Sequence, residues 1–297
     1  MMENLLSAMD AILITGPTAS GKSALAVELA KRHDGVVVNA DSMQVYDTLR
    51  VLTARPSDGE MQGVPHYFYG HVPAGSAYST GAWLRDVEAL LPGLRAEGRL
   101  PVFVGGTGLY FKALTGGLSE MPAIPDEVRT RLRGRLQEQG AEHLHSQLVE
   151  GDPAVAAGLN PQDGQRIVRA LEVLEATGRS IADFRGRAGP AIVEPKAAQK
   201  IVVLPERAIL HARIDGRFEG MLEQGAEDEV KALLALSLSP EMPVMKAIGV
   251  SQIASMLKGE MSRSEVLAKG ATATRQYAKR QMTWFRNQMD ESWERRG

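Results

Sequence analysis

The stretch GPTASGKS (16–23) separates two glycines by four residues and follows the second with Lys22 and Ser23. It lies between the apolar run AILIT (11–15) and the segment SALAVELAKR, whose apolar residues have helical spacing. Glycines let backbone N–H groups turn toward an anion, and the amino end of a helix and Lys22 add positive charge. The stretch therefore predicts a phosphate-binding loop between a strand and a helix, with Ser23 positioned to hold Mg²⁺. The loop alone does not distinguish a triphosphate such as ATP from a diphosphate.

Three further apolar runs are rich in Val and too short for a typical helix: GVVVN (35–39), PVFVG (101–105) and KIVVL (200–204). Segments with helical spacing lie between them. Strands that alternate with helices predict an α/β fold of the P-loop NTPase-like kind, with a parallel sheet covered by helices on both faces. Right-handed crossovers place the carboxyl ends of all strands at one edge of the sheet, where such folds bind ligands.

The region from 117 to 195 differs, because it is helical by period and contains no strand signal. We predict that it forms an all-helical insertion domain. The α/β core, with C-terminal helices, would then be built from residues 1–116 and 196–297.

The composition excludes several classes of protein. Of the 297 residues, 44% are hydrophobic and 24% are charged, which is typical of a folded globular protein. There is no cysteine, and this excludes disulfides, thiolate zinc sites and a cysteine nucleophile. No apolar run reaches the roughly 18 residues of a membrane helix, and the first ten residues lack the basic segment of a secretory signal. We therefore expect a cytoplasmic enzyme.

The net charge of −2 argues against a general nucleic-acid binder. However, residues 266–289 include five basic residues and no acidic one, and a local basic surface can attract a polyanion.

Two more loops follow predicted strands. NADSMQVY (39–46) comes after the second strand and GGTGLY (105–110) after the third, so Asp41 and Thr107 would both lie beside the phosphate loop. Asp41 could equally be a helix N-cap, and Thr107 a turn hydroxyl. Their shared position at the ligand-binding edge favours a functional role.

Seven blocks of the chain occur in the order found in one enzyme family. They are GPTASGKS, DSMQVY, GGTGLY, QRIVRALEV, HARIDGRFEGML, KAIGVSQ and TRQYAKRQMTWF, and they run from about residue 11 to 286. The sequence therefore resembles the tRNA dimethylallyltransferases, also called tRNA isopentenyltransferases, of the bacterial type without a zinc-finger extension. The resemblance implies transfer of a dimethylallyl group from dimethylallyl diphosphate to N6 of the adenine 3′ of the anticodon (position 37), with release of diphosphate.

The same resemblance implies that the phosphate loop holds the diphosphate of the prenyl donor. The expected diphosphate ligands are Gly16, Pro17, Thr18, Ala19, Ser20, Gly21, Lys22, Ser23 and Arg213, with Mg²⁺ on Ser23. Asp41 would accept the N6 proton, and Thr107 would orient the donor and the adenine. Arg213 and Arg217 lie one helical turn apart. We expect Arg217 to bind the diphosphate with Lys22, whereas Arg213 could equally belong to a solvated helix face.

The target adenine must leave the anticodon stack to reach the sheet edge. The expected tRNA contacts are Asp41, Ser42, Met43, Gln44 and Thr107 near the base, Arg129 in the insertion, Gln165, Arg166, Ile167, Val168 and Arg169 by resemblance, and Arg275, Lys279 and Arg280 on the terminal helix. An amphipathic helix with a solvated basic side would also explain residues 165–169. We assign Trp284 and Phe285 to the core, because an aromatic stripe at helical spacing usually packs inside.

Two other functions are compatible with the phosphate loop. A kinase of a small molecule or nucleotide would use the loop for ATP, and a non-catalytic RNA-binding switch would use it to sense a nucleotide. The segment LTARP (52–56) has Leu52 and Arg55 where the family usually has glycine and lysine, so the local turn is expected to differ. We expect the chain to act as a monomer on dimethylallyl diphosphate and the anticodon stem-loop of tRNA.

Overall fold

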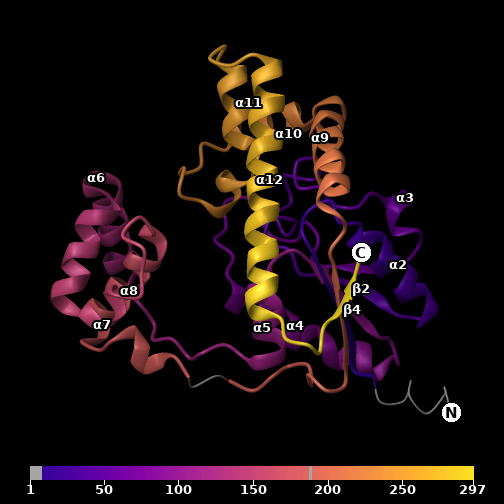
Figure 1. Cartoon of the computed structure of the whole chain (residues 1–297), viewed down its shortest axis with the longest axis horizontal. Helices are drawn as coiled ribbons and strands as arrows, with labels where there is room; N and C mark the ends of the chain where they lie inside the picture. Colours follow the sequence, from indigo (N-terminus) through magenta and orange to yellow (C-terminus); the bar gives the residue numbers. More distant parts are fainter. Residues whose placement is uncertain (1–8, 187–188) are drawn as a thin grey trace. The chain divides into compact units, whose positions relative to one another are not determined.

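The computed structural model describes residues 9–186 and 189–297. Within them, six strands form one parallel sheet in the order β3-β2-β4-β1-β5-β6 (Figure 1). The strands are β1 (Ala11–Thr15), β2 (Val36–Asn39), β3 (His66–Tyr67), β4 (Pro101–Gly105), β5 (Ala198–Val203) and β6 (Glu294–Arg296). The four predicted strands are confirmed as β1, β2, β4 and β5. The edge strands β3 and β6 were not predicted, because neither is buried enough to require an apolar run.

The helices of the first half of the described chain alternate with the strands, as expected. They are α2 (Lys22–Arg32), α3 (Asp58–Met61), α4 (Thr80–Ala96) and α5 (Gly108–Gly116). Those of the second half are α6 (Asp126–Gly151), α7 (Pro153–Ala156), α8 (Gly164–Thr177), η1 (Ile181–Phe184), α9 (Arg207–Glu223), α10 (Ala226–Ala235), η2 (Pro243–Lys246), α11 (Val250–Leu257) and α12 (Arg263–Gln288). None of the helices in these two ranges is long and apolar enough to cross a membrane.

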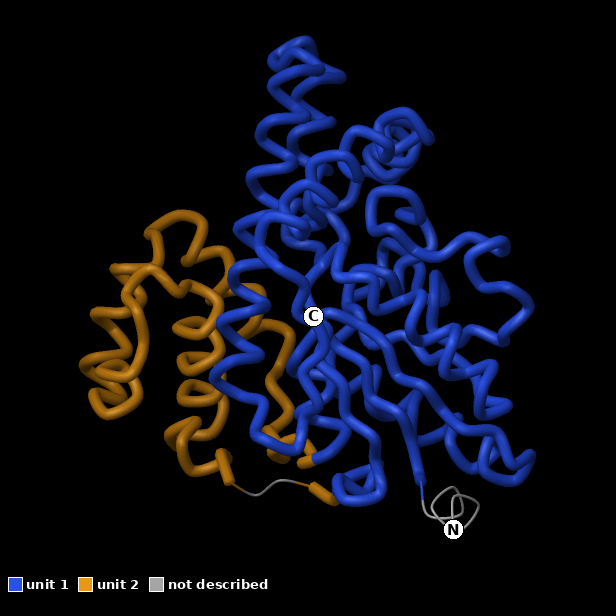
Figure 2. Tube along the Cα trace, turned by 45° about the vertical axis from the view of Figure 1, so that its right-hand side comes forward, with its two compact units in different colours: residues 1–115, 191–297 blue, residues 116–190 orange. Residues whose placement is uncertain are grey.

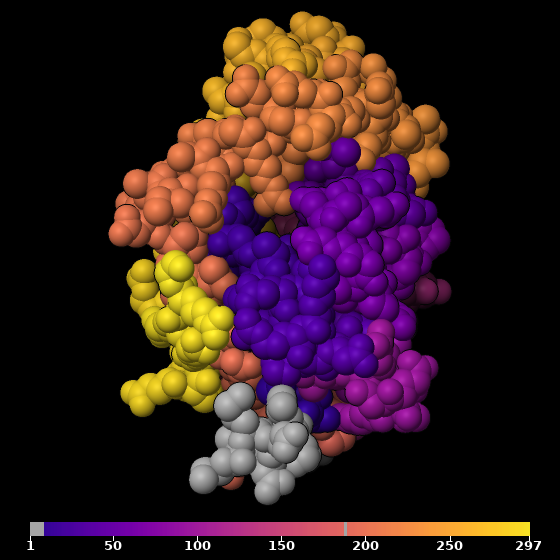
Figure 3. Space-filling view, turned by 90° about the vertical axis from the view of Figure 1, so that its right-hand side faces the viewer, coloured from indigo at the N-terminus to yellow at the C-terminus, as the bar shows by residue number. Residues whose placement is uncertain are grey.

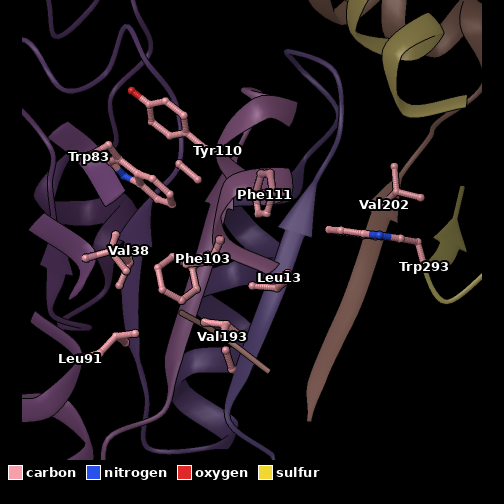
Figure 4. Packing of buried hydrophobic residues seen from close by; sticks show 14 of the residues in the cluster. Leu13, Val38, Trp83, Leu91, Phe103, Tyr110, Phe111, Val193, Val202 and Trp293 are labelled. Carbon is pink, nitrogen blue, oxygen red and sulfur yellow. The ribbon is translucent and has the colours of Figure 1, made fainter. Parts of the chain in front are cut away.

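Each central strand is buried on both faces because its side chains alternate between two hydrophobic clusters. Leu13 packs with the residues of α4 and α5, whereas its neighbours Ile12 and Ile14 pack with α2. In the cluster that contains Leu13, the rings of Trp83 and Tyr110 stack with their centroids 4.4 Å apart (Figure 4). Helices on both faces leave only the strand ends open to a ligand.

The chain divides into two compact units, one formed by Met1–Thr115 with Ala191–Gly297 and one by Gly116–Pro190 (Figure 2). The second unit contains helices and no strand among its described residues. It is shorter than the expected insertion of 117–195. Residues 191–195 belong to the first unit, because the N–H groups of Ile192 and Val193 both donate to the Leu114 carbonyl and Val193 is fully buried there.

The C-terminal helix α12 is long and anchored at both ends. Ser262 and Glu265 form a capping box at its start. Val266 packs in one hydrophobic cluster, and Phe285 is buried in the cluster over the sheet with Trp284 packed against it. The assignment of Phe285 to the core is thus confirmed, whereas Trp284 is only partly buried and packs against this cluster. After α12 the chain returns to the sheet, and β6 lies along β5, so the yellow C-terminal residues flank the indigo N-terminal part in Figure 3.

Candidate active site

The phosphate loop joins β1 to α2 and leaves the amino end of α2 without a side-chain cap. Gly21 at the N-cap has φ of 92°, a left-handed conformation that favours glycine, and no side chain of residues 9–186 or 189–297 bonds the first amides of the helix. Gly16 lies against β5, since a Cβ there would be 2.6 Å from the Val203 carbonyl oxygen. The first N–H groups of a helix have no partner within the helix. This end of α2 can therefore receive an anion.

Lys22 is the first residue of α2, and its side chain turns back over the loop. Its Nζ donates a 3.2 Å hydrogen bond to the Pro17 carbonyl. Burial of the ammonium group lowers the pKa of Lys22 to about 8; the Asp41 carboxylate raises it and Arg217 lowers it further. The opposing effects of Asp41 and Arg217 show that both side chains share the electrostatic environment of Lys22.

Two arginines of α9 lie beside this loop. Arg213 Nη1 donates to the Ser20 carbonyl at 3.4 Å, on the outer side of the loop. Burial lowers the pKa of the Arg217 guanidinium, whereas Glu60 and Asp41 oppose that shift. Arg213 therefore contacts the phosphate loop, and Arg217 interacts electrostatically with Lys22 and Asp41.

Asn39 and Trp83 set the position of Asp41, and sequence reasoning did not identify either. Asn39 ends β2, is fully buried, and donates 3.0 Å hydrogen bonds to the carbonyls of Asp41 and Phe68. Its Oδ1 accepts from the Asp41 N–H at 2.9 Å, and its carbonyl accepts the Trp83 indole N–H at 2.8 Å. Asp41 Oδ1 in turn accepts from the Met43 N–H at 2.9 Å, which forms a tight turn and not a helix N-cap. Asp41 Oδ2 has no hydrogen-bond partner among the described residues and is free to face a ligand.

Thr107 links the β4–α5 loop to the Asp41 loop. Its Oγ1 accepts from the Ser42 N–H at 3.0 Å and donates to the Ser42 hydroxyl at 3.3 Å. The Thr107 N–H donates to the Ala40 carbonyl at 3.3 Å. Gly105 permits this approach, because a Cβ there would lie 2.0 Å from the Ala40 carbonyl oxygen. The Thr107 hydroxyl therefore joins two loops that are 65 residues apart in the sequence. It does not act as a turn hydroxyl within its own loop.

The negative charge of the Asp41 carboxylate acts on three tyrosine hydroxyls. Burial, together with the negative charge of Asp41, raises the pKa of the hydroxyls of Tyr69, Tyr110 and Tyr277. These phenols therefore stay protonated over the physiological range.

Gln281 of α12 is a further site residue that local pattern did not reveal. Its Oε1 accepts from the Thr18 N–H of the phosphate loop at 3.0 Å. Its Nε2 donates to the Gly106 carbonyl of the β4–α5 loop at 2.9 Å. The side chain is buried, and both partners are distant in sequence.

The segment after Asp41 is held by other loops. The Gln44 amide nitrogen donates to the carbonyls of Thr53 and Ala54 at 3.0 and 2.9 Å. Gln44 was predicted to contact the base, but its N–H donors are already bonded within the protein. The Leu52 side chain is buried, and its N–H donates to a Glu229 carboxylate that also accepts the two preceding N–H groups.

Arg55, the second departure from the family pattern, turns back onto its own loop. Its Nη1 donates to the Tyr46 carbonyl at 3.1 Å. The guanidinium of Arg55 therefore bonds to the backbone of the loop that precedes it in the chain.

In the unit Gly116–Pro190, Ile167 and Val168 are not available to RNA through their side chains. They are 0% and 5% exposed in the hydrophobic core of the unit, which corrects the expectation that every residue of 165–169 contacts tRNA. The α8 period places the two residues inward, and Gln165 and Arg166 outward. Arg169 is partly buried, and its Nη1 lies 3.1 Å from the buried Glu172 carboxylate.

The remaining basic candidates are surface residues, and most of them have acidic partners. Arg166 pairs with Asp163 at 2.9 Å and Arg129 with Asp126 at 3.6 Å. On α12, Arg275 is paired with Asp215, Arg280 lies over the Tyr277 ring, and Lys279 is exposed. An RNA phosphate would have to compete with each of these ion pairs.

Two family models cover the chain. The model described as IPP transferase matches residues 44–288, and the model described as Isopentenyl transferase matches residues 9–71. The tRNA dimethylallyltransferase of Rhizobium leguminosarum bv. trifolii (strain WSM2304) is 78% identical over 294 residues, which cover 99% of each chain. That of Agrobacterium fabrum (strain C58 / ATCC 33970) is 69% identical over 295 residues, again 99% of each chain.

Solved structures share the fold. The full-length tRNA isopentenylpyrophosphate transferase from Bacillus halodurans superposes with a TM-score of 0.67 at 32% identity, over 96% of this chain and 89% of that one. A eukaryotic dimethylallyltransferase acting on tRNA superposes with a TM-score of 0.78 at 27% identity, over 93% and 70% of the two chains. The predicted α/β fold of the P-loop NTPase-like kind is confirmed, and by family model and identity alike the chain belongs to the IPP transferase family.

Proposed function

We propose that this protein transfers a dimethylallyl group from dimethylallyl diphosphate to N6 of the adenine 3′ of the anticodon in tRNA, position 37, and releases diphosphate. The observation that carries the proposal is the meeting of three loops at one edge of the sheet. They bring together the uncapped end of α2 with Lys22, the free Oδ2 of Asp41, and Thr107. Leaving-group stabilisation, proton acceptance and orientation each have a candidate group there.

The chemistry accounts for these groups. An adenine amine is a poor nucleophile, because its lone pair is delocalised into the ring. The allylic C1 of the donor compensates, since positive charge that develops on it spreads over the double bond. The C1–O bond breaks and the N6–C1 bond forms, while the amides of α2, Lys22 and Arg217 stabilise the negative charge on the departing diphosphate. The N6 proton passes to Asp41.

Magnesium fits the same site. Ser23 is exposed in the first turn of α2, next to Lys22, and its hydroxyl oxygen is a hard ligand of the kind that Mg²⁺ binds together with phosphate oxygens. The ion, when bound, would offset diphosphate charge. Ser23 would hold it, with the remaining ligands supplied by the diphosphate and water.

The tRNA is proposed to bind through its anticodon stem-loop, with the adenine turned out of the stack toward Asp41. Six basic residues, exposed or partly buried, supply the phosphate contacts in this scheme; they are Arg129, Arg166, Arg169, Arg275, Lys279 and Arg280. Ser42 and Met43 would border the base, and the protein would act as a monomer.

Mass analysis of tRNA nucleosides tests the proposed function. Unmodified tRNA is incubated with the protein, Mg²⁺ and dimethylallyl diphosphate, and a parallel sample receives ATP and no prenyl donor. We expect an adenosine heavier by one dimethylallyl group, at position 37, only with the prenyl donor. Transfer of phosphate from ATP without prenylation would support the kinase alternative and reject the proposal.

Donor binding should depend on pH through Lys22. Its ammonium is protonated below a pKa of about 8 in the free protein, and only the protonated form attracts the diphosphate. As pH rises above 8, pyrophosphate affinity should fall by up to about tenfold per pH unit. Calorimetry on wild type and Lys22→Arg from pH 7 to 9.5 checks this. Arginine keeps its charge over this range, and the titration of pyrophosphate itself affects both proteins equally. A constant ratio between the two affinities would contradict the prediction.

A further inference from the structure

We propose that Gln281 is a positioning residue that fixes the phosphate loop and the Thr107 loop relative to each other. The inference rests on the proposed function, because it concerns the geometry between the diphosphate cradle and the proton acceptor. Gln281 lies on α12, far in sequence from both loops, and its amide bonds one group in each.

The orientation of the Gln281 amide is determined by its partners. The Thr18 N–H can only donate, so it requires Oε1, and the Gly106 carbonyl can only accept, so it requires Nε2. An amide of this length provides an acceptor and a donor at every pH, whereas a carboxyl group of the same length provides both only when it is protonated. Gln281 is 6% exposed, so loss of either bond would leave a poorly hydrated group without a partner.

The β4–α5 loop is shaped to receive α12. A Cβ on Gly106 would lie 2.2 Å from Gln281 Nε2, and a Cβ on Gly108 would lie 2.2 Å from the Trp284 ring. The same Cβ position on Gly106 is 3.3 Å from Asp41 Oδ2. The glycines therefore allow α12 to approach closely, and Gln281 and the free oxygen of the proposed base both lie beside the Cβ position of Gly106.

A continuous series of bonds then joins the two halves of the site. Gln281 connects Thr18 to Gly106, and the adjacent Thr107 connects to Ser42, which follows Asp41. Ala278 and Phe285 are buried on either side of Gln281 along α12, so the helix offers a rigid support. Since reacting groups must be aligned to within about 1 Å, loosening this connection should slow transfer without removing any group that touches the reactants.

Two substitutions separate this role from simple packing. Gln281→Met keeps the volume but loses both bonds. Gln281→Glu keeps the volume and the acceptor, but its ionised carboxylate faces the Gly106 carbonyl with no proton to donate. Asn287→Met is the matched control, because Asn287 is exposed on the same helix and makes no side-chain hydrogen bond within the described residues.

Kinetics and calorimetry on the full-length protein test the proposal. We expect Gln281→Met to lower kcat/KM by about 10- to 100-fold and to weaken pyrophosphate binding, while Asn287→Met matches wild type and all three variants melt within a few degrees of it. If Gln281→Met has wild-type kcat/KM and pyrophosphate affinity, the side chain only fills space and the proposal is overturned.

The pH profile of Gln281→Glu provides a readout that does not depend on Gln281→Met. A protonated carboxyl group has an acceptor and a donor. The activity of Gln281→Glu relative to wild type should therefore rise as pH falls from 8 to 5.5. The nearby charged groups Asp41, Lys22 and Arg217 are present in both proteins, so the ratio to wild type at each pH isolates the effect of the substituted side chain. A flat ratio would overturn the proposal. Absence of prenyl transfer by wild type would instead reject the proposed function, and pyrophosphate binding would still test the role of Gln281 in the loop.

Discussion

The Asp41→Asn variant is expected to transfer the prenyl group about 10²- to 10⁴-fold more slowly than wild type, with little change in tRNA affinity. Asparagine keeps the oxygen that accepts the Met43 N–H, so the turn after β2 should persist. Its amide nitrogen, however, cannot accept the N6 proton at the position where Asp41 Oδ2 is free. The loss should therefore fall on kcat, because the missing group acts in the reaction and not in binding.

Single-turnover rates with saturating donor and tRNA measure this effect, and filter binding measures tRNA affinity. Glu88→Gln is the control, because it removes one carboxylate from an exposed position on α4 and should leave the rate unchanged. A normal rate for Asp41→Asn would remove Asp41 from the mechanism. It would also support the alternative function of a non-catalytic RNA-binding protein.

Lys22→Ala is expected to lower kcat/KM for dimethylallyl diphosphate by about 10²- to 10³-fold. Lys22 brings a full positive charge to the amino end of α2, where the leaving diphosphate gains negative charge as C1–O cleaves. Among the residues that the structure describes, its Nζ bonds only to the Pro17 carbonyl, and a bound diphosphate would offer a far better acceptor. Both the KM for the donor and kcat should change, since the charge attracts the donor and also stabilises the transition state.

Steady-state kinetics with varied donor and fixed tRNA separate these two contributions. Lys31→Ala is the matched control, because Lys31 lies on the same helix, is exposed, and within the described part of the chain bonds only Gln62 through its ammonium. A donor KM and a kcat equal to those of wild type would show that the phosphate loop does not hold the prenyl diphosphate. A change in the KM for tRNA alone would place Lys22 on the acceptor side.

The four central strands could be predicted because buried parallel strands must be apolar along their whole length. β3 and β6 could not, since an edge strand of two or three residues needs only backbone pairing. The boundary of the helical unit was misplaced by five residues at its C-terminal end, because Ile192 and Val193 bond to Leu114, a contact that local composition does not encode.

Part of the candidate active site could likewise be predicted from the sequence. The phosphate loop, Asp41 and Thr107 were predictable because each directly follows a predicted strand, and parallel strands deliver their carboxyl ends to one edge. The burial of Ile167 and Val168 was also within reach of the sequence, since the period of α8 points both inward. Family membership followed from the order of seven motifs along the chain.

By itself, the sequence determined the fold class, the phosphate loop and the candidate acid–base and basic residues, because these depend on short-range pattern and on the geometry common to parallel sheets. Only the tertiary structure decided that Asn39 and Trp83 orient Asp41, that ion pairs occupy Arg166 and Arg275, and that Gln281 joins two loops. The physical reason is distance along the chain. Gln281 is separated by 263 and 175 residues from its two partners, and a hydrogen bond between such positions leaves no trace in local periodicity.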